Sequence, residues 1–232
     1  MLYKIGGNKI EPLDETKFNE EAILEQDLED WIEREPSILG EDLLIIGRQV
    51  HIQGVNDRID LLGVDTSGNL VIIELKRGSL KAPVDIQSLR YASYVSRWEY
   101  DQIEEQASVY FSEKGEADFN FNEKFEDFCA SAGIDEIPDL NQDQRIIIVG
   151  NRVKEKLGSV ALWLREHGVD IKVVEVSLFR HKDNFILAPQ VVIPLPSTER
   201  FEIGRYGSRT VSYTHLRAHE TRHDLVCRLL LE

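Results

Sequence analysis

The stretch that decides the fold is RIDLLGVDTSGNLVIIELKR, residues 58–77, which predicts a β-hairpin. Two runs rich in apolar and β-branched residues flank the segment TSG at 66–68. Its glycine can take the positive φ that a three-residue hairpin loop needs. If the loop is centred on its serine, Val64 faces Leu70, and a bulge in the loop would shift this register by one residue.

The same register brings ionisable side chains together at the open end of the hairpin. Asp60 faces Glu74 and Arg58 faces Lys76, and strand alternation puts Asp60, Glu74 and Lys76 on one face. Two carboxylates with Cβ atoms roughly 5 Å apart repel each other unless one is protonated or a cation lies between them. A hard divalent ion with oxygen ligands fits there, and Lys76 can hold or polarise a water beside it. Metal, water and a nearby cation are what phosphodiester hydrolysis requires.

A known nuclease signature contains these residues. Asp60 followed by Glu74-Leu75-Lys76 resembles the PD-(D/E)XK motif, with Ile59 where that motif has proline. The stretches DLEDWIEREPSILGEDL, RIDLLGVDTSGNLVIIELKRG and DIQSLRYASYV are similar to the catalytic domain of the NucS endonuclease family. The similarity covers about residues 20–100, and weaker similarity continues through 145–150 and 161–176.

The resemblance implies a fold, a metal and a reaction. The fold is α/β, with a restriction-endonuclease-like αβββαβ core whose mixed central sheet is flanked by helices. Asp60, Glu74 and the Leu75 carbonyl would bind Mg²⁺, with Mn²⁺ as an alternative, and Lys76 would position the attacking water. The expected substrate is DNA, so the resemblance implies a metal-dependent endodeoxyribonuclease.

Two helices are expected to complete the site. A glutamate of the first helix can join the metal ligands in this family, and Glu25 is the best match, while Gln26 and Glu29 compete by helical register. Gln87 and Tyr91 match the QxxxY motif of the RecB-like branch, in which they support the catalytic lysine or contact substrate. By spacing alone, Tyr91 can equally be a core residue and Gln87 an exposed one.

Four arginines near these elements are candidate contacts to DNA phosphates: Arg48, Arg58, Arg77 and Arg90. Arg48 and Arg58 can equally be salt-bridged surface residues.

The charge of the chain is unevenly distributed. The net charge of −15 opposes loose, salt-driven binding to nucleic acid. However, the acidity lies in residues 1–47, with net −9, and 99–143, with net −12. Residues 48–98 carry +2 and residues 144–210 carry +4. A local patch around the hairpin can therefore still bind DNA.

The remaining composition indicates a soluble globular protein. Apolar residues make up 42% and charged residues 30% of the sequence. No apolar run approaches the roughly 18 residues of a membrane span, and the first residues lack a signal-peptide layout. The two cysteines are far apart, which argues against a disulfide framework. We expect a cytoplasmic protein with no membrane partner, and the sequence leaves monomer and homodimer open.

Hydrophobic periodicity divides the chain into five parts. They are an N-terminal arm or small hairpin (1–19), the catalytic core (20–98), an acidic helical insert (99–143), the C-terminal part of the core sheet (144–210) and a tail (211–232). Helices are expected at about 19–35, 83–97, 100–111, 121–132 and 152–167, and strands at 43–50, 145–150, 170–180 and 185–194.

The tail, VSYTHLRAHETRHDLVCRLLLE, differs from the rest of the chain in composition. It contains three of the six histidines, spaced four residues apart, which would suggest a metal site. However, it resembles the translation of a transposon-end sequencing adapter, since VSYTHLRAHE and DLVCRLLLE are both encoded by adapter sequence. We therefore expect the tail to be non-native and the natural C-terminus to be missing.

Two other functions compete with the nuclease. One is a catalytically inactive module that binds nucleic acid or protein on the same fold, with Asp60, Glu74 and Lys76 as a salt-bridged cluster. The other is a structural domain whose function lies in a lost C-terminal part.

Overall fold

The chain was analysed as a computed structural model, which describes residues 2–52, 57–80, 84–116 and 118–195. The chain divides into two units, Met1–Pro196 and Ser197–Glu232, and every element below belongs to the first. Pro83, expected in the first turn of a helix, and the tail 211–232 lie outside the described residues.

A mixed seven-stranded sheet forms the centre of this unit. Its strands lie in the order β3-β8-β7-β6-β5-β4, and β9 also pairs with β8. Strand β5 pairs antiparallel with β4 and with β6, whereas β7 pairs parallel with β6 and with β8. The strands are β3 (Asp14–Thr16), β4 (Leu44–His51), β5 (Arg58–Val64), β6 (Leu70–Leu80), β7 (Gln144–Val153), β8 (Asp170–His181) and β9 (Asn184–Ile193).

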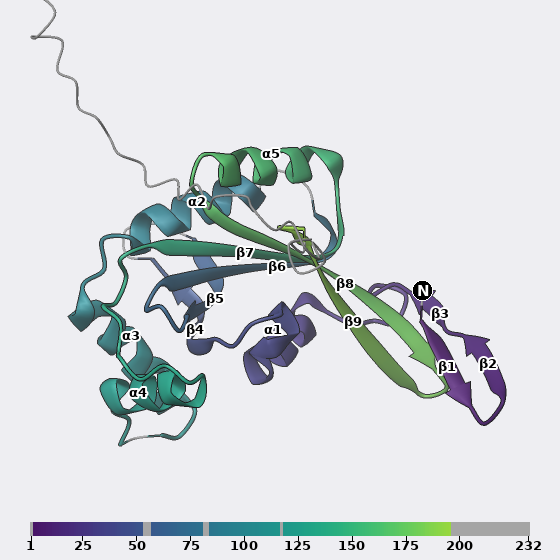
Figure 1. The fold of residues 1–232 in the computed structure, drawn as a ribbon, viewed down its shortest axis with the longest axis horizontal. Helices are drawn as coiled ribbons and strands as arrows, with labels where there is room; N and C mark the ends of the chain where they lie inside the picture. Colours follow the sequence, from purple (N-terminus) through teal and green to yellow (C-terminus); the bar gives the residue numbers. More distant parts are fainter. Residues whose placement is uncertain (1, 53–56, 81–83, 117, 196–232) are drawn as a thin grey trace, which may run out of the picture. The chain divides into compact units, whose positions relative to one another are not determined.

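Helices lie on both faces of the sheet, and some of them belong to the crossover connections that its parallel strand pairs need. Figure 1 shows α2 (Val84–Val95) and α5 (Glu155–Glu166) on one face, and α1 (Glu25–Arg34) and α3 (Tyr100–Glu113) on the other. Helix α4 (Phe121–Ser131) packs against α3. The element order α1-β4-β5-β6-α2-β7 is the αβββαβ order expected from the sequence, so the predicted fold class is confirmed.

The continuously apolar sequence of β7 is explained by its position in the sheet, where both of its faces are buried. Ile146 and Ile148 pack in the cluster beneath α5, whereas Ile147 and Val149 pack in the larger core on the opposite face. Successive side chains of a strand point to opposite faces, and here both faces are covered by helices. The sequence RIIIVG therefore suits only a central strand.

The hairpin has the predicted register. Pairing between β5 and β6 runs from Val64 opposite Leu70 to Leu61 opposite Ile73. All four side chains are fully buried and they lie on both faces of the sheet, so a slip of one residue would force the apolar side chains of both faces to repack. The burial and the loop together hold the register.

The hairpin loop is closed by Asp65 and Gly68. The Asp65 carboxylate accepts hydrogen bonds from the backbone N–H groups of Ser67 and Asn69, each at 2.9 Å. Gly68 has φ of 81°, and a Cβ at this position would lie 2.4 Å from the carbonyl oxygen of Asp139. Glycine is thus required by both the backbone conformation and the close approach of another segment.

The first helix begins later than predicted. Asn19 was the expected N-cap, but residues 18–22 form turns and α1 begins at Glu25. Ala22 has φ of 55°, in the left-handed region, which interrupts a helix at this point. Asp27 instead caps the helix by accepting a hydrogen bond from the Leu24 N–H at 2.7 Å. As a result, Glu25 lies in the first turn of α1.

The remaining elements lie around this core. Strands β1 (Tyr3–Gly6) and β2 (Lys9–Pro12) form a two-stranded hairpin, and Pro36–Leu39 form a 3₁₀ turn. Cys129 on α4 is a buried free thiol. No helix in the part of the chain that the structure describes is long and apolar enough to cross a membrane.

Candidate active site

Asp60 lies on β5, one residue before Leu61, whose pairing with Ile73 is the outermost pair of the hairpin. Its carboxylate accepts a hydrogen bond from the Leu75 N–H at 2.8 Å, which fixes the side chain against β6. Burial raises the pKa of Asp60, although the nearby Lys76 ammonium and this hydrogen bond oppose the rise. Asp60 is therefore an oriented carboxylate at the edge of the core.

Glu74 lies on β6 and is fully buried. Neither of its carboxylate oxygens has a hydrogen-bond partner among the described residues. Burial first, and then the charge of Asp60, raise the pKa of Glu74 from 4.5 to about 8, while the charge of Lys76 lowers it. The backbone N–H of Asp60 lies near the carboxylate and also lowers this pKa, but it makes no hydrogen bond to either oxygen. A buried carboxylate without partners is costly unless it is protonated or bound to a cation. Among the residues of this site, Glu74 therefore gives the strongest indication that a cation can bind here.

Lys76 brings three oxygen atoms together. Its Nζ lies 2.6 Å from the Leu75 carbonyl oxygen, 3.2 Å from the Glu25 carboxylate and 3.4 Å from the Asp60 carboxylate. Burial disfavours the charged ammonium, but the surrounding carboxylates outweigh this effect and raise the pKa of Lys76. The ammonium is thus surrounded by the side chains and carbonyl expected from the sequence to ligate a metal.

The donor set fits a hard divalent cation only if backbone oxygen takes part. No group of three or more histidine, cysteine, aspartate or glutamate side chains in the described ranges is arranged to hold a metal. Asp60 and Glu74 can supply two carboxylates, and the Leu75 carbonyl can supply a third oxygen, which suits Mg²⁺. The two buried Glu74 oxygens without hydrogen-bond partners are the observation that supports this fit.

Gln87 and Tyr91 meet each other on α2. The Gln87 side-chain amide donates a hydrogen bond to the Tyr91 hydroxyl at 2.9 Å. Tyr91 is almost completely buried, and burial raises its pKa, with the charge of Glu74 adding to the rise. The two side chains therefore support each other on α2, and among the described residues no hydrogen bond joins Gln87 to Lys76.

The acids of the first helix have different surroundings. Glu25 reaches Lys76, whereas Glu29 is buried and accepts hydrogen bonds from the Arg48 and Gln49 side chains. Gln49 was missed by sequence reasoning. Its amide donates to Glu29 at 3.1 Å and makes a longer contact of 3.4 Å to Asp60, with its backbone at φ of 48°. No sequence pattern marks this residue, because its position depends on how α1 packs against β4.

The four arginines have different surroundings. Arg48 contacts the carboxylates of three residues of α1, so we leave it out of the proposed phosphate contacts. Arg90 forms an ion pair of 2.9 Å with Asp57 but remains nearly half exposed. Arg58 is exposed beside the site at the start of β5. The side chain of Arg77 lies outside the part that the structure describes.

Comparisons with known proteins give little beyond this geometry. No protein-family model and no curated protein matches the chain. Among solved structures, a repair endonuclease from Pyrococcus abyssi shares 20% identity at a TM-score of 0.41, covering 66% of this chain and 47% of that one. An EndoMS–dsDNA complex shares 16% identity at a TM-score of 0.40, covering 65% and 44%. The chain therefore spans less than half the length of either structure.

Proposed function

We propose that this chain is a metal-dependent nuclease that hydrolyses phosphodiester bonds of DNA. The observation that carries the proposal is Glu74, a fully buried carboxylate with no hydrogen-bond partner among the described residues, placed next to Asp60 and Lys76. A protein that used these residues only for stability would be expected to satisfy both Glu74 oxygens.

Each residue has a role that follows from its position. Asp60, Glu74 and the Leu75 carbonyl would hold Mg²⁺ or Mn²⁺, which when bound polarises the phosphate and lowers the pKa of water. Lys76 can donate hydrogen bonds to a water or to the phosphate, and its positive charge stabilises the charge that develops on the phosphate oxygens. Its long, half-buried side chain can turn from the three oxygens that it contacts toward a substrate.

The surrounding residues would hold this group in place. The Leu75 N–H and Gln49 amide orient the Asp60 carboxylate, and the buried Tyr91 belongs to the apolar core on the side of α2. Exclusion of water on this side strengthens every charge interaction within the site. DNA as the substrate and a NucS-like cleavage activity rest on the resemblance of the motif residues and flanking sequence.

The test is a cleavage panel with the full chain. Duplex, mismatched, branched and single-stranded DNA would be incubated with Mg²⁺, with Mn²⁺ or with EDTA. We expect cutting of at least one DNA form, dependent on the metal and lost in Lys76→Met, which keeps the length of the side chain but removes its charge. Cleavage that persists in EDTA, or that is unchanged in Lys76→Met, would contradict the proposed roles.

One observation favours a second candidate, a module that binds nucleic acid without cutting it. Lys76 already has three oxygen partners in the structure, as a salt-bridged structural cluster would. Binding of DNA with no metal-dependent cut of any form in the panel would support this alternative.

A further inference from the structure

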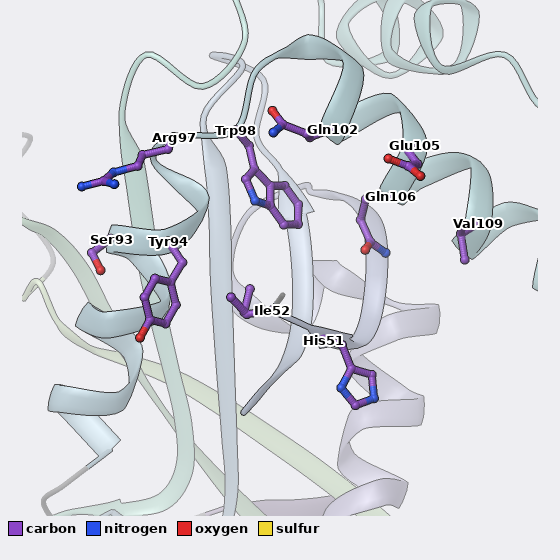
Figure 2. A pocket seen from close by; sticks show the side chains of 10 residues that line it. All are labelled: His51, Ile52, Ser93, Tyr94, Arg97, Trp98, Gln102, Glu105, Gln106 and Val109. Carbon is purple, nitrogen blue, oxygen red and sulfur yellow. The ribbon is translucent and has the colours of Figure 1, made fainter. Parts of the chain in front are cut away.

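A pocket of about 530 Å³ lies outside the proposed active site. It is formed by the end of β4, the C-terminal end of α2 with the residues that follow it, and the exposed face of α3 (Figure 2). None of the proposed catalytic or metal-binding residues lines it. Its volume is within the range of typical small-ligand sites.

The pocket combines flat aromatic rings with amide groups. Figure 2 shows the Trp98 indole and the Tyr94 ring projecting into it beside Ile52, with the Gln106 amide across from Trp98. Trp98 and Tyr94 are half-buried, so part of each ring remains accessible. Rings of this kind stack on nucleobases. The Gln106 Nε2 makes a long contact of 3.4 Å to the Ile46 carbonyl oxygen, which leaves the amide oxygen and a second N–H for a base edge.

The charged groups at the rim are of both signs, with one arginine and one glutamate among the lining residues. Arg97 and His51 line the pocket, and Arg97 extends away from its centre in Figure 2. Glu105 is the one acidic residue among those that line the pocket. A purely apolar ligand would gain nothing from the guanidinium or the amide, whereas a nucleotide uses both.

The fold also joins this pocket to the proposed active site. His51 pairs with Arg58, which lies two residues before Asp60 on β5. On α2, Tyr94 follows Tyr91 by one turn, which is about 4.5 Å along the helix axis. The pocket and the proposed active site are therefore connected through the β4–β5 pairing and through α2.

We propose that this pocket receives one unpaired nucleobase of a DNA strand, stacked on Trp98 and Tyr94 and bound at its edge by Gln106. The location of that base next to the cut phosphate rests on the proposed function. The binding of the base does not, because it requires no metal and no chemistry.

The test measures binding in EDTA with the full chain. A six-nucleotide single-stranded DNA, a fully paired duplex and a free deoxynucleoside monophosphate would each be titrated, with tryptophan fluorescence and DNA anisotropy as readouts. We expect the single strand to quench fluorescence and to bind at least about tenfold more tightly than the free nucleotide. Trp98→Phe should remove the quenching but keep most of the affinity, and Trp98→Ala should weaken binding about tenfold.

Two further variants make the result unambiguous. Trp163→Phe replaces an exposed tryptophan on α5 and should leave quenching and affinity unchanged. Gln106→Glu keeps the side-chain shape but adds a negative charge, and it should weaken binding even if Trp98→Ala does not fold. Equal affinity for strand and free nucleotide, quenching that survives in Trp98→Phe, or full affinity in both Trp98→Ala and Gln106→Glu would overturn the proposal.

This outcome is separable from the nuclease test. Metal-dependent cleavage with no effect of the pocket variants on binding overturns the pocket alone. Strand binding that depends on Trp98 and Gln106, without cleavage under any metal, overturns the nuclease alone.

Discussion

Replacing Glu74 by glutamine should change how the stability of the folded protein depends on pH. Glu74 has a pKa of about 8 in the folded state, raised first by burial and then by the charge of Asp60, against 4.5 as its ordinary value. Below pH 4.5 the group is protonated in both states. Between 4.5 and 8 the unfolded chain loses this proton while the folded protein keeps it, so the free energy of unfolding falls as pH rises.

The magnitude follows from the width of this window. Each pH unit costs about 1.4 kcal/mol, so the loss attributable to Glu74 is on the order of 3 kcal/mol at pH 7 and up to about 5 kcal/mol above pH 8. Glu74→Gln cannot ionise and should lack this loss. Its buried amide without partners costs about 1–3 kcal/mol at every pH, so the slope is the informative quantity, and the absolute stability is not.

The assay is urea denaturation in EDTA at pH 5, 6, 7 and 8, followed by circular dichroism. The free energy of unfolding of the wild type should fall relative to Glu74→Gln by about 1 kcal/mol or more per pH unit. Glu126→Gln, which changes an exposed glutamate of α4, should remain parallel to the wild type. If the wild-type and Glu74→Gln curves are parallel from pH 5 to 8, the reasoning about Glu74 is refuted.

Binding of Mg²⁺ should offset the loss of stability at pH 8. If Mg²⁺ binds at Glu74, saturating metal at pH 8 adds about 2.7 kcal/mol at a concentration of 100 times Kd. This gain should be absent in Glu74→Gln. Equal stabilisation of the two proteins would place the binding of Mg²⁺ elsewhere.

Three other substitutions test how the fold and the site are held. Gly68→Ala should lower the free energy of unfolding by about 1–3 kcal/mol in urea denaturation, because its φ is left-handed and a Cβ would meet a backbone carbonyl; a change below 0.5 kcal/mol would contradict this. Arg145→Met should cost about 3–5 kcal/mol in the same assay, because Arg145 pairs with Glu41 and the buried Asp65, and an unchanged midpoint would show that the ion pairs contribute nothing. Gln49→Leu should weaken Mg²⁺ binding about tenfold or more by calorimetry while the fold persists, and unaltered affinity would remove Gln49 from the site.

The sequence by itself was sufficient for the hairpin and for the order of elements. Strand alternation has a period of two residues, and the glycine of the loop marks where the chain reverses, so both signals are local. They place Val64 opposite Leu70, and this pairing runs as far as Leu61 opposite Ile73. Counting one residue further outward predicts Asp60 opposite Glu74. The apolar run of β7 likewise identified a central strand, because only a strand buried on both faces has no polar side.

Local signals failed where the position of a residue depends on distant packing. Asn19 is a good N-cap residue, yet the helix begins at Glu25 because the chain first turns through a left-handed residue. That shift decides which glutamate meets Lys76. Arg48 was a plausible phosphate contact, and only the packing of α1 against β4 shows that three carboxylates surround it.

The electrostatic state of the site was also decided by tertiary structure. The sequence predicts that Asp60 and Glu74 are neighbours, but the raised pKa of Glu74 comes first from its complete burial, which exists only in the folded core. The pocket of Trp98 and Gln106 has the same origin, since Trp98 lies in the connection between α2 and α3, Gln106 lies on α3, and both meet the end of β4 only in the folded protein. The alternation of residues along the sequence determines the strands and their register. The burial of Glu74 and the meeting of side chains from distant segments arise only once the core has formed.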